Sequence, residues 1–472
     1  MKNKEKILYI LVFVIFLVLV CYVASKHEYW ADEAQAWLLA RDASIKDLLL
    51  HQLRYEGHPI LWYLVIKLFM LFKLPYKYFN VISIIFSTLG VLVFLFKSKF
   101  KWYIKVLLPF TFFVFYQFSV IARSYCIVLF LLSLLASIWD KREEKYWLFT
   151  ILLILLINLE VFTFLLAGSI FFLELVDFVK NKDKRNKVKI TCFIVLFLSF
   201  LFTSIYLFPA SSVYKPANAV EFRLSKTFFV SSNFSSGISI IIDFALMVFL
   251  ALILCKKGKS YLYRTLILVM PIIAFIFIVY FNVWHYGVLF FIFLFIIWIY
   301  KLENDKGLIA LLLITCFIQI TWSVNSSLHD FNNVYFPSKN VANFIKMYDY
   351  KNLKIVGYGF NVVSINPYFE KNIYDNWILD KGFYTFNLKD ESYFSYEHER
   401  EKYFDKADII IFRKYKDYKV IFDETKYNLY KFRSFTTFQY NNFNEVVLFY
   451  VCVNKNIDNV KIINKSNAFF VD

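Results

Sequence analysis

Long apolar runs alternate with short lysine-rich breaks over the first two thirds of this chain. A helix of about 20 apolar residues crosses the ~30 Å hydrocarbon core of a bilayer, and most of these runs come close to that length. The pattern therefore predicts a mainly α fold, a polytopic bundle of about 11 transmembrane helices. They are expected at Ile7–Ala24, Tyr78–Phe96, Trp102–Phe118, Ser124–Trp139, Tyr146–Ile157, Val161–Val179, Ile190–Phe208, Gly237–Leu254, Leu262–Phe281, Tyr286–Tyr300 and Leu308–Val324.

The segment Pro59–Phe72 is the ambiguous part of this pattern, because it has only about 14 residues and contains Lys67. If it does not cross the membrane, the lysine-rich breaks fall on the side of the N-terminus, as the positive-inside rule expects of cytoplasmic loops. If Pro59–Phe72 does cross, all of the lysine-rich breaks lie outside. The breaks are Lys97–Lys105, Lys141–Lys145, Lys180–Lys189, Lys256–Arg264 and Lys301–Lys306. We therefore predict eleven spans, with Pro59–Phe72 in or dipping into the outer leaflet.

The first apolar run follows three lysines that lie among the first six residues and favour a cytoplasmic N-terminus. The run is long and lacks a clear small-residue cleavage site, so it is predicted to be a transmembrane helix and not a removed signal peptide. Residues 1–324 then form a multi-pass module in the cell (cytoplasmic) membrane, with an outer juxtamembrane loop at 25–77. Everything after Val324 is expected to be extracytoplasmic.

Residues 325–472 differ in character, being rich in Asn, Asp, Lys and Tyr with only short apolar segments. A helix is predicted from Ser338 to Met347. Runs of β-branched and aromatic residues predict strands at Leu353–Tyr358, Asp408–Phe412, Lys419–Phe422, Tyr427–Phe432 and Val446–Val453. The C-terminal part is therefore predicted to be a small extracytoplasmic α/β domain.

Composition agrees with a membrane protein and narrows the alternatives. Hydrophobic residues make up 60% of the chain, with 58 Phe, whereas an ordinary soluble protein has about 45–50%. Disordered, collagen-like and disulfide-stapled classes are excluded. The net charge of +17 lies mostly between apolar runs, so it is interpreted as setting the topology, and no nucleic-acid partner is predicted. The six cysteines show no metal-site or disulfide spacing.

The unusual polar residues of the membrane module gather on one side under this topology, although none of them was used to set it. Ionisable groups at membrane depth are costly and commonly functional. The outer face is therefore the predicted site, and it collects Asp32, Glu33, Glu56, His58, Arg123, Glu160 and His285.

Two adjacent carboxylates, Asp32 and Glu33, follow the first span and lie between tryptophans. Such a pair suits a general base and a partner that orients an acceptor. The alternative is a helix-capping box formed by Asp32 and Gln35. The apolar positions that follow, as far as Leu53, have helical spacing and predict an amphipathic helix on the outer interface.

Glu56 and His58 stand at a predicted helix start, after a turn at Gly57 and beside Pro59. They serve either to position a substrate or only to shape the turn. Arg41 is likewise a candidate for positioning the acceptor.

Arg123, at the outer end of a span, either snorkels to water or binds a phosphate or carboxylate with its guanidinium fork. Glu160, in a tight outer turn, is interpreted as a solvated hairpin tip. His285 begins an outer-face helix between Trp284 and Tyr286. It is either structural or part of a lipid-phosphate or sugar pocket.

The order of these motifs resembles the GT-C superfamily of polytopic glycosyltransferases, especially bacterial relatives of the dolichyl-phosphate-mannose–protein mannosyltransferases. The resemblance covers nearly the whole membrane module and includes an outer C-terminal domain. Its matching elements are Asp32-Glu33, His58-Pro59, Arg123-Ser124-Tyr125 and His285-Tyr286-Gly287. The chain departs from the pattern in having Ile60, Trp284 and Glu160, where relatives often carry a second Pro, a cation and a Val-His pair.

The resemblance implies a transferase that moves a sugar from a polyprenyl-phosphate donor, such as an undecaprenyl-phosphate sugar, at the outer membrane face and typically with inversion. The acceptor is a protein, a lipid or a growing glycan. Asp32 would be the general base and Glu33 would help to position the acceptor. Arg123, Tyr125 and His285 would stabilise the leaving phosphate. No metal ion or other cofactor is predicted.

Three other function classes stay open. A transporter or flippase of lipid-linked glycans would place charges near the bilayer midplane and show internal repeats, and neither is visible. A surface-glycan polymerase or ligase would use a large outer loop, for which Phe208–Ser236, with Lys215, Glu221 and Arg223, is a candidate. In a binding protein, the outer domain would do the work and the membrane part would be a scaffold.

Overall fold

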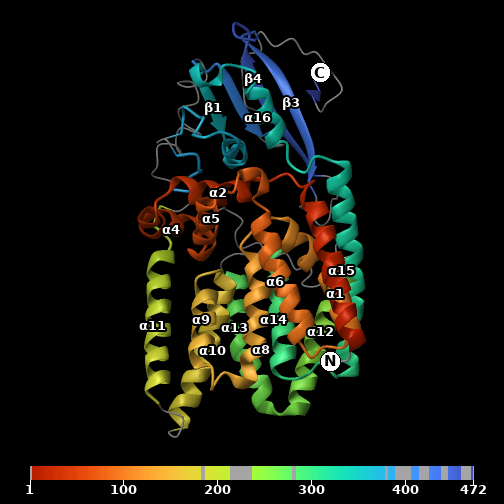
Figure 1. Ribbon diagram of the computed structural model, residues 1–472. Coiled ribbons are helices and arrows are strands. Elements are labelled where there is room, and N and C mark those ends of the chain that lie inside the picture. Colours follow the sequence, from red (N-terminus) through yellow and green to blue (C-terminus); the bar gives the residue numbers. More distant parts are fainter. Residues whose placement is uncertain are drawn as a thin grey trace.

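The computed structural model describes residues 3–181, 186–212, 236–278, 283–377, 381–387, 406–413, 425–436, 445–458 and 469–470. The fold is mainly helical, with a small sheet in the C-terminal region. Figure 1 shows a helical bundle, a sheet above one end of it and a layer of short helices between the two. We call the end of the bundle beneath the sheet the domain end and the other, near which the N-terminus lies, the opposite end.

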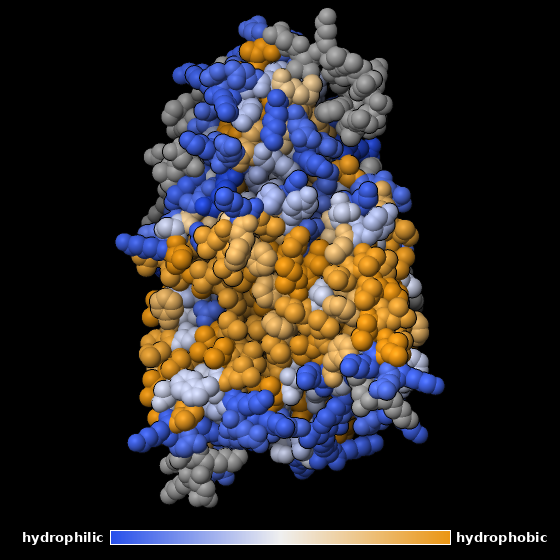
Figure 2. Space-filling view, in the orientation of Figure 1, coloured by the Kyte–Doolittle hydropathy of each residue, from blue (hydrophilic) through white to orange (hydrophobic). Residues whose placement is uncertain are grey.

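Seven of the described helices are long and apolar enough to cross a bilayer. They are α1 (Asn3–Ala24), α6 (Val81–Lys97) with the preceding η2 (Tyr76–Tyr78), α7 (Trp102–Leu107) continued by η3 (Leu108–Phe110) and η4 (Phe113–Val120), α10 (Val161–Lys180), α11 (Lys187–Leu207), α13 (Lys259–Ile278) and α15 (Lys306–Asn332). Their surface forms a broad apolar band with hydrophilic regions above and below it (Figure 2). These features fit a lipid bilayer, as the hydropathy pattern predicted.

Four other predicted spans form helices of the same bundle, namely α8 (Tyr125–Ile138), α9 (Tyr146–Ile157), α12 (Ser236–Lys257) and α14 (Val283–Ile299). α8 and α9 have 14 and 12 residues. At 1.5 Å per residue they are roughly 18–21 Å long, which is less than the hydrocarbon thickness. The number of eleven crossings therefore stays a prediction.

Aromatic side chains fill the bundle around η4. Phe112, just before η4, lies flat on Trp322 of α15, with ring centroids 3.5 Å apart and planes within 2°. Phe115 of η4 packs edge to face on Phe16 of α1. η4 is a π-helical segment, a rare conformation that is frequent at functional sites, and it ends just before Arg123.

A layer of short helices lies across the domain end (Figure 1). It contains α2 (Ala31–Asp42), α3 (Ile45–Asp47), η1 (Leu48–Gln52), α4 (Leu53–Glu56) and α5 (Leu61–Leu71). With 11 residues, α5 is only about 16 Å long, and that this segment does not cross the membrane stays a prediction.

The amphipathic helix predicted as far as Leu53 is wrong in two respects. α2 ends at Asp42, because Ala43 adopts an extended conformation. Nine of its 12 residues are buried, since α2 packs against α5 on one side and against η8 (Phe360–Tyr368) of the C-terminal part on the other. The helix is therefore enclosed by protein and does not lie on an open interface.

The C-terminal part combines α16 (Ser338–Ile345) and η7 (Tyr350–Asn352) with a five-stranded sheet. The strands, in the spatial order β1-β2-β4-β3-β5, are β1 (Ile355–Tyr358), β2 (Ile409–Arg413), β4 (Glu445–Asn454), β3 (Tyr427–Thr436) and β5 (Phe469–Phe470). β1 and β2 are parallel, with Ile355 opposite Ile409, and the other pairs are antiparallel. The predicted helix and four of the five predicted strands are confirmed, and Lys419–Phe422 lies outside the described residues.

The connection between the bundle and the C-terminal part is helical. α15 continues past the predicted end of its span at Val324 as far as Asn332. This extension carries Asp330, whose side chain is buried at the domain end.

Candidate functional site

An ion pair between Asp32 and Arg123 forms the centre of the candidate site. Asp32 lies in the first turn of α2, and Arg123 lies in the turn between η4 and α8. Oδ2 of Asp32 is 3.0 Å from Nη1 of Arg123, and the two side chains are 22% and 11% exposed. Burial raises the pKa of the Asp32 carboxyl, and Arg123 opposes part of that rise. The pair is therefore shielded from water but still open on one side.

Glu56 adds a second carboxyl group at the last residue of α4. Its Oε1 accepts a hydrogen bond of 2.8 Å from Nε2 of Gln35. Burial raises the pKa of Glu56 to about 7, and the charges of His58, Asp32 and Arg123 also act on it. The charge of Glu56 consequently changes near neutral pH, close to the central ion pair.

Glu160 links His58 to the residue that follows Arg123. Oε2 of Glu160 is 3.2 Å from Nδ1 of His58, and its Oε1 accepts a hydrogen bond from the Ser124 hydroxyl. The interpretation of Glu160 as a solvated hairpin tip is wrong, because Glu160 is only 1% exposed. It is the N-cap of α10, a position where the helix dipole favours a negative charge.

The segment that carries His58 is fixed over the turn between α9 and α10. Gly57 ends α4 in the left-handed region, at φ +70°, which suits glycine. The Leu61 N–H then donates to the carbonyl of Asn158 at 2.9 Å, and the Ile60 N–H donates to the Tyr206 hydroxyl at 3.3 Å. These bonds keep His58 beside Glu160.

Tyr125 and His285 form the floor of the site. The Arg123 guanidinium lies 5.9 Å from the centre of the Tyr125 ring. The His285 ring packs edge to face on Tyr125 at 6.0 Å. α14 approaches this closely because of Gly287, where a Cβ would come within 2.5 Å of the Phe118 ring. The structure therefore brings together five predicted site residues around Asp32: Glu56, His58, Arg123, Tyr125 and His285.

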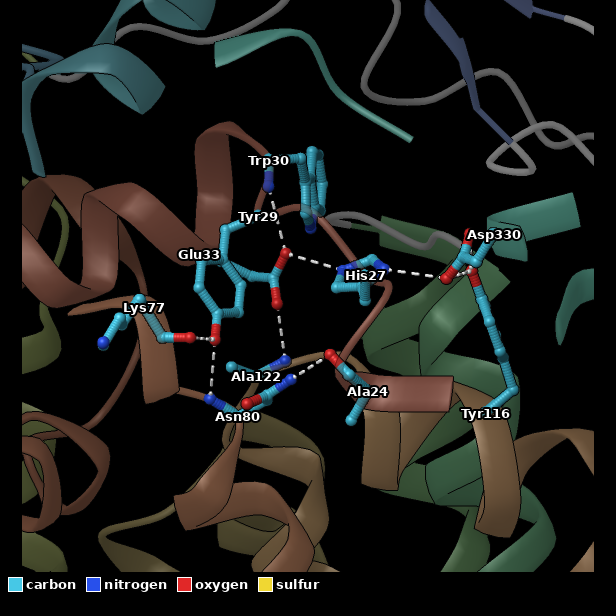
Figure 3. Close-up of polar contacts among 10 residues, drawn as sticks. All are labelled: Ala24, His27, Tyr29, Trp30, Glu33, Lys77, Asn80, Tyr116, Ala122 and Asp330. Carbon is cyan, nitrogen blue, oxygen red and sulfur yellow. Dashed lines mark hydrogen bonds and ion pairs between the residues drawn. The ribbon is translucent and has the colours of Figure 1, made fainter. Parts of the chain in front are cut away.

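Glu33 is held by backbone N–H groups of Trp30 and of Ala122, the residue before Arg123 (Figure 3). Its Oε1 accepts a 2.6 Å hydrogen bond from the Ala122 N–H, and its Oε2 accepts one of 3.1 Å from the Trp30 N–H. The side chain is completely buried. This geometry corrects the predicted contact of Glu33 with the acceptor. It also makes Glu33, and not Asp32 with Gln35, the carboxylate that caps the start of α2.

A buried charge network continues from Glu33 across the domain end (Figure 3). Nε2 of His27 is 3.3 Å from Oε2 of Glu33, and its Nδ1 is 3.0 Å from Oδ2 of Asp330. The Tyr116 hydroxyl of η4 donates to Asp330 at 3.0 Å. Burial lowers the pKa of His27, but the two carboxylates outweigh burial and raise it to about 10. The charged His27 ring therefore links α15 to the start of α2, and Asp330 extends this network to η4 through Tyr116.

Arg41 is not part of the site. It lies at the other end of α2, roughly 13 Å from Asp32 along the helix axis. Its Nε pairs with Oδ1 of Asp42 at 2.6 Å, and its Nη1 donates to the Phe369 carbonyl at 2.8 Å. Its predicted role in positioning a substrate is therefore corrected: Arg41 docks the C-terminal part on α2. Gln35 contributes to the same docking, since its Oε1 accepts from the Tyr384 N–H at 2.8 Å.

No family model, curated protein or solved structure matches this chain. A function for the site therefore rests on the chemistry of its own residues. Across the described ranges, no three His, Cys, Asp or Glu side chains are grouped so that they could hold a metal ion.

Sequence reasoning missed three residues of this region. His27 and Asp330 each follow the apolar part of a span, and only their placement on the same predicted side hinted that they meet. The third, Tyr63 of α5, is buried and within electrostatic reach of Glu56 and Arg123. Lys215, Glu221 and Arg223 of the candidate polymerase loop lie outside the described residues.

The arrangement combines a carboxylate that accepts protons with a cation that binds anions, side by side in a mostly dry site. Such a site suits a reaction that removes a proton from one atom while negative charge develops nearby on another.

Proposed function

We propose that this protein is an integral membrane glycosyltransferase. It moves a sugar from a polyprenyl-phosphate donor to an acceptor at the outer face of the cytoplasmic membrane. The observation that carries the proposal is the Asp32–Arg123 pair, in which a proton-accepting carboxylate lies 3.0 Å from a phosphate-binding guanidinium. The order of site motifs along the chain, which resembles that of GT-C enzymes, supports the same assignment.

The chemistry follows from this pair. Asp32 takes a proton from the acceptor hydroxyl or amine, the acceptor forms a bond to the anomeric carbon, and the bond from that carbon to the phosphate oxygen breaks. The departing lipid phosphate gains negative charge, which Arg123 stabilises. Once Asp32 carries the proton it no longer holds Arg123, so the guanidinium charge becomes available as the phosphate needs it. Burial raises the pKa of Asp32 and so makes it a stronger base.

The sidedness of the proposal comes from the lysine-rich breaks. Cytoplasmic loops carry an excess of Lys and Arg, so the opposite end of the bundle is assigned to the cytoplasm. The domain end then faces outward, and the C-terminal part lies on the acceptor side.

Donor binding tests the proposal. Replacing Arg123 with Ala is expected to weaken the binding of an undecaprenyl-phosphate sugar about 10- to 100-fold, because a charge-assisted bidentate contact to the phosphate is lost. Native mass spectrometry of the full-length protein in detergent measures the bound fraction across a donor titration. Arg54→Ala removes an arginine that bonds the Phe208 carbonyl at the domain end and is the matched control.

Two outcomes would overturn the assignment. Equal binding by wild type and Arg123→Ala would remove Arg123 from the phosphate site. Binding of a diphosphate-linked glycan but not of a monophosphate sugar would favour the polymerase or ligase class.

Donor affinity is also expected to depend on pH around neutrality. The pKa of Glu56 is raised to about 7, so this group is neutral below that pH and negative above it. A negative charge beside Arg123 repels the donor phosphate, and affinity should fall roughly two- to fivefold from pH 6 to pH 8. The same titration with Glu56→Gln should show a flatter profile. An unchanged profile in Glu56→Gln would contradict the role of this carboxyl.

A further inference from the structure

A basic cavity of about 440 Å³ lies at the opposite end of the bundle, away from the Asp32 site. It is formed where η5 (Trp139–Lys141) and the residue after it meet the neighbouring ends of α12, α13 and α14. Four cations line it: Arg142, Lys257, Arg264 and Lys301. Its volume is within the range of about 300–1,000 Å³ that is typical of small-ligand sites.

Two of these cations, Arg142 and Arg264, form ion pairs with carboxylates of α10. Nε of Arg142 bonds Glu174 at 2.8 Å, and Nη2 of Arg264 bonds both oxygens of Asp177 at 2.8 and 3.0 Å. Within the described part of the chain, Nη2 of Arg142 and Nε and Nη1 of Arg264 donate to no protein atom. The guanidinium groups are therefore fixed in place and retain donors for a ligand.

The other two cations complete the electrostatics. Lys257 donates to the Tyr300 carbonyl and lies over the Tyr261 ring. Lys301 pairs with Asp140 at 3.0 Å, and both side chains are about half exposed. Among the described residues, four cations thus face three carboxylates, counting the two of α10, which leaves a net positive charge at the cavity. It fits a single anionic group, and N–H forks of this kind match phosphate.

The surroundings of the cavity indicate that this phosphate belongs to a lipid. Trp139, Tyr261 and Tyr300 line the cavity, and such aromatic residues concentrate at the level of lipid headgroups. On α13, directly after the cavity residues, Leu266 and Met270 are exposed large apolar side chains. A molecule with its phosphate in the cavity could therefore lay its acyl chains along α13. Basic pockets between helices at the cytoplasmic side are known to take anionic headgroups.

We propose that this cavity binds the phosphate of an anionic phospholipid. The ligand is a phosphodiester with a glycerol-type headgroup, held by Arg142 and Arg264 and oriented by the interfacial aromatic residues. The site is independent of the Asp32 site and of the reaction assigned to it.

Native mass spectrometry of the detergent-purified full-length protein tests this proposal, with dioleoyl-phosphatidylglycerol and the matched dioleoyl-phosphatidylcholine as probes. Wild type should retain phosphatidylglycerol in preference to phosphatidylcholine. The double variant Arg264→Gln/Lys301→Gln should lower phosphatidylglycerol affinity roughly tenfold. The control Lys97→Gln/Lys101→Gln removes the same charge from exposed lysines of a neighbouring break and should leave affinity unchanged.

A gain-of-binding variant guards against misfolding as a cause of the loss. Asp140→Asn removes a carboxylate that lines the cavity and is expected to raise phosphatidylglycerol affinity about threefold. Three results would overturn the proposal: equal retention of the two lipids, an equal loss of affinity in Arg264→Gln/Lys301→Gln and in the control Lys97→Gln/Lys101→Gln, or no gain in Asp140→Asn. Competition by free glycerol phosphate as strong as by the lipid would also overturn it, in favour of a water-soluble anion.

Discussion

Asp32→Asn is expected to lower sugar transfer by about 10²- to 10⁴-fold while donor affinity stays equal or rises slightly. The loss follows because an amide cannot take the acceptor proton, and a positioned base contributes a factor of this size. Binding survives because Arg123, released from the carboxylate 3.0 Å away, still meets the phosphate. Single-turnover release of polyprenyl phosphate from a labelled donor in native membranes measures the first quantity, and the donor titration measures the second.

Asp47→Asn is the matched control for this experiment. Asp47 is a carboxylate of the same juxtamembrane layer, and it pairs with Lys381 of the C-terminal part at 2.9 Å. Its replacement should leave transfer within about twofold of wild type. A transfer rate in Asp32→Asn close to that of wild type would show that Asp32 is not the base and would direct attention to Glu56.

The second large effect is expected on stability, from His27→Phe. The substitution leaves the carboxylates of Glu33 and Asp330 buried without their shared cation. Breaking a buried charge pair in this way costs about 3–5 kcal/mol, which for a chain of this size corresponds to a fall in Tm of roughly 3–5 °C. Thermal unfolding followed by intrinsic fluorescence in detergent measures the shift.

His329 provides the control, because it neighbours Asp330 on α15 but neither of its ring nitrogens has a hydrogen-bond partner within the described structure. His329→Phe should change Tm by less than about 2 °C. In the triple variant His27→Phe/Glu33→Gln/Asp330→Asn, the neutral amides should restore part of the loss. A His27→Phe protein as stable as wild type would contradict a structural role for the network.

The pH dependence gives this prediction a second readout. The pKa of His27 is raised from its ordinary value of 6.5 to about 10 in the folded protein. Its contribution to stability is therefore fully present below pH 6.5 and is lost as the pH rises toward 10. The difference in Tm between wild type and His27→Phe should shrink over this interval, and a constant difference would show that the imidazolium charge is not what matters.

The residues around Asp32 could be predicted because topology alone sorts polar residues onto one side of a membrane. Glu56 with His58, Arg123 and His285 come from three separate segments, and placing those segments on the domain side is enough to bring them together. Membrane topology does not show the direction in which a side chain points. Successive residues on a helix point about 100° apart, so Asp32 faces the opening while its neighbour Glu33 faces Ala122.

The buried network was beyond sequence reasoning for a different reason. His27 and Asp330 are separated by 303 positions, and no periodicity relates them. The sequence also does not show which end of α2 lies at the site. Arg41 is therefore predicted to belong to the site, whereas in the structure it contacts Phe369. In the C-terminal part, runs of β-branched and aromatic residues predict five strands, of which four are confirmed, whereas the parallel pairing of β1 with β2 depends on contacts between distant segments.

The extension of α15 beyond Val324 bears on how the protein can be divided. A chain cut where hydropathy ends the last span would lose Asp330, and with it one of the two carboxylates that hold His27. It would also lose the C-terminal residues that hold α2 through Gln35 and Arg41. The membrane part and the C-terminal part therefore share these contacts, and a recombinant membrane fragment would need to extend at least to Asn332 to keep the support beneath Arg123.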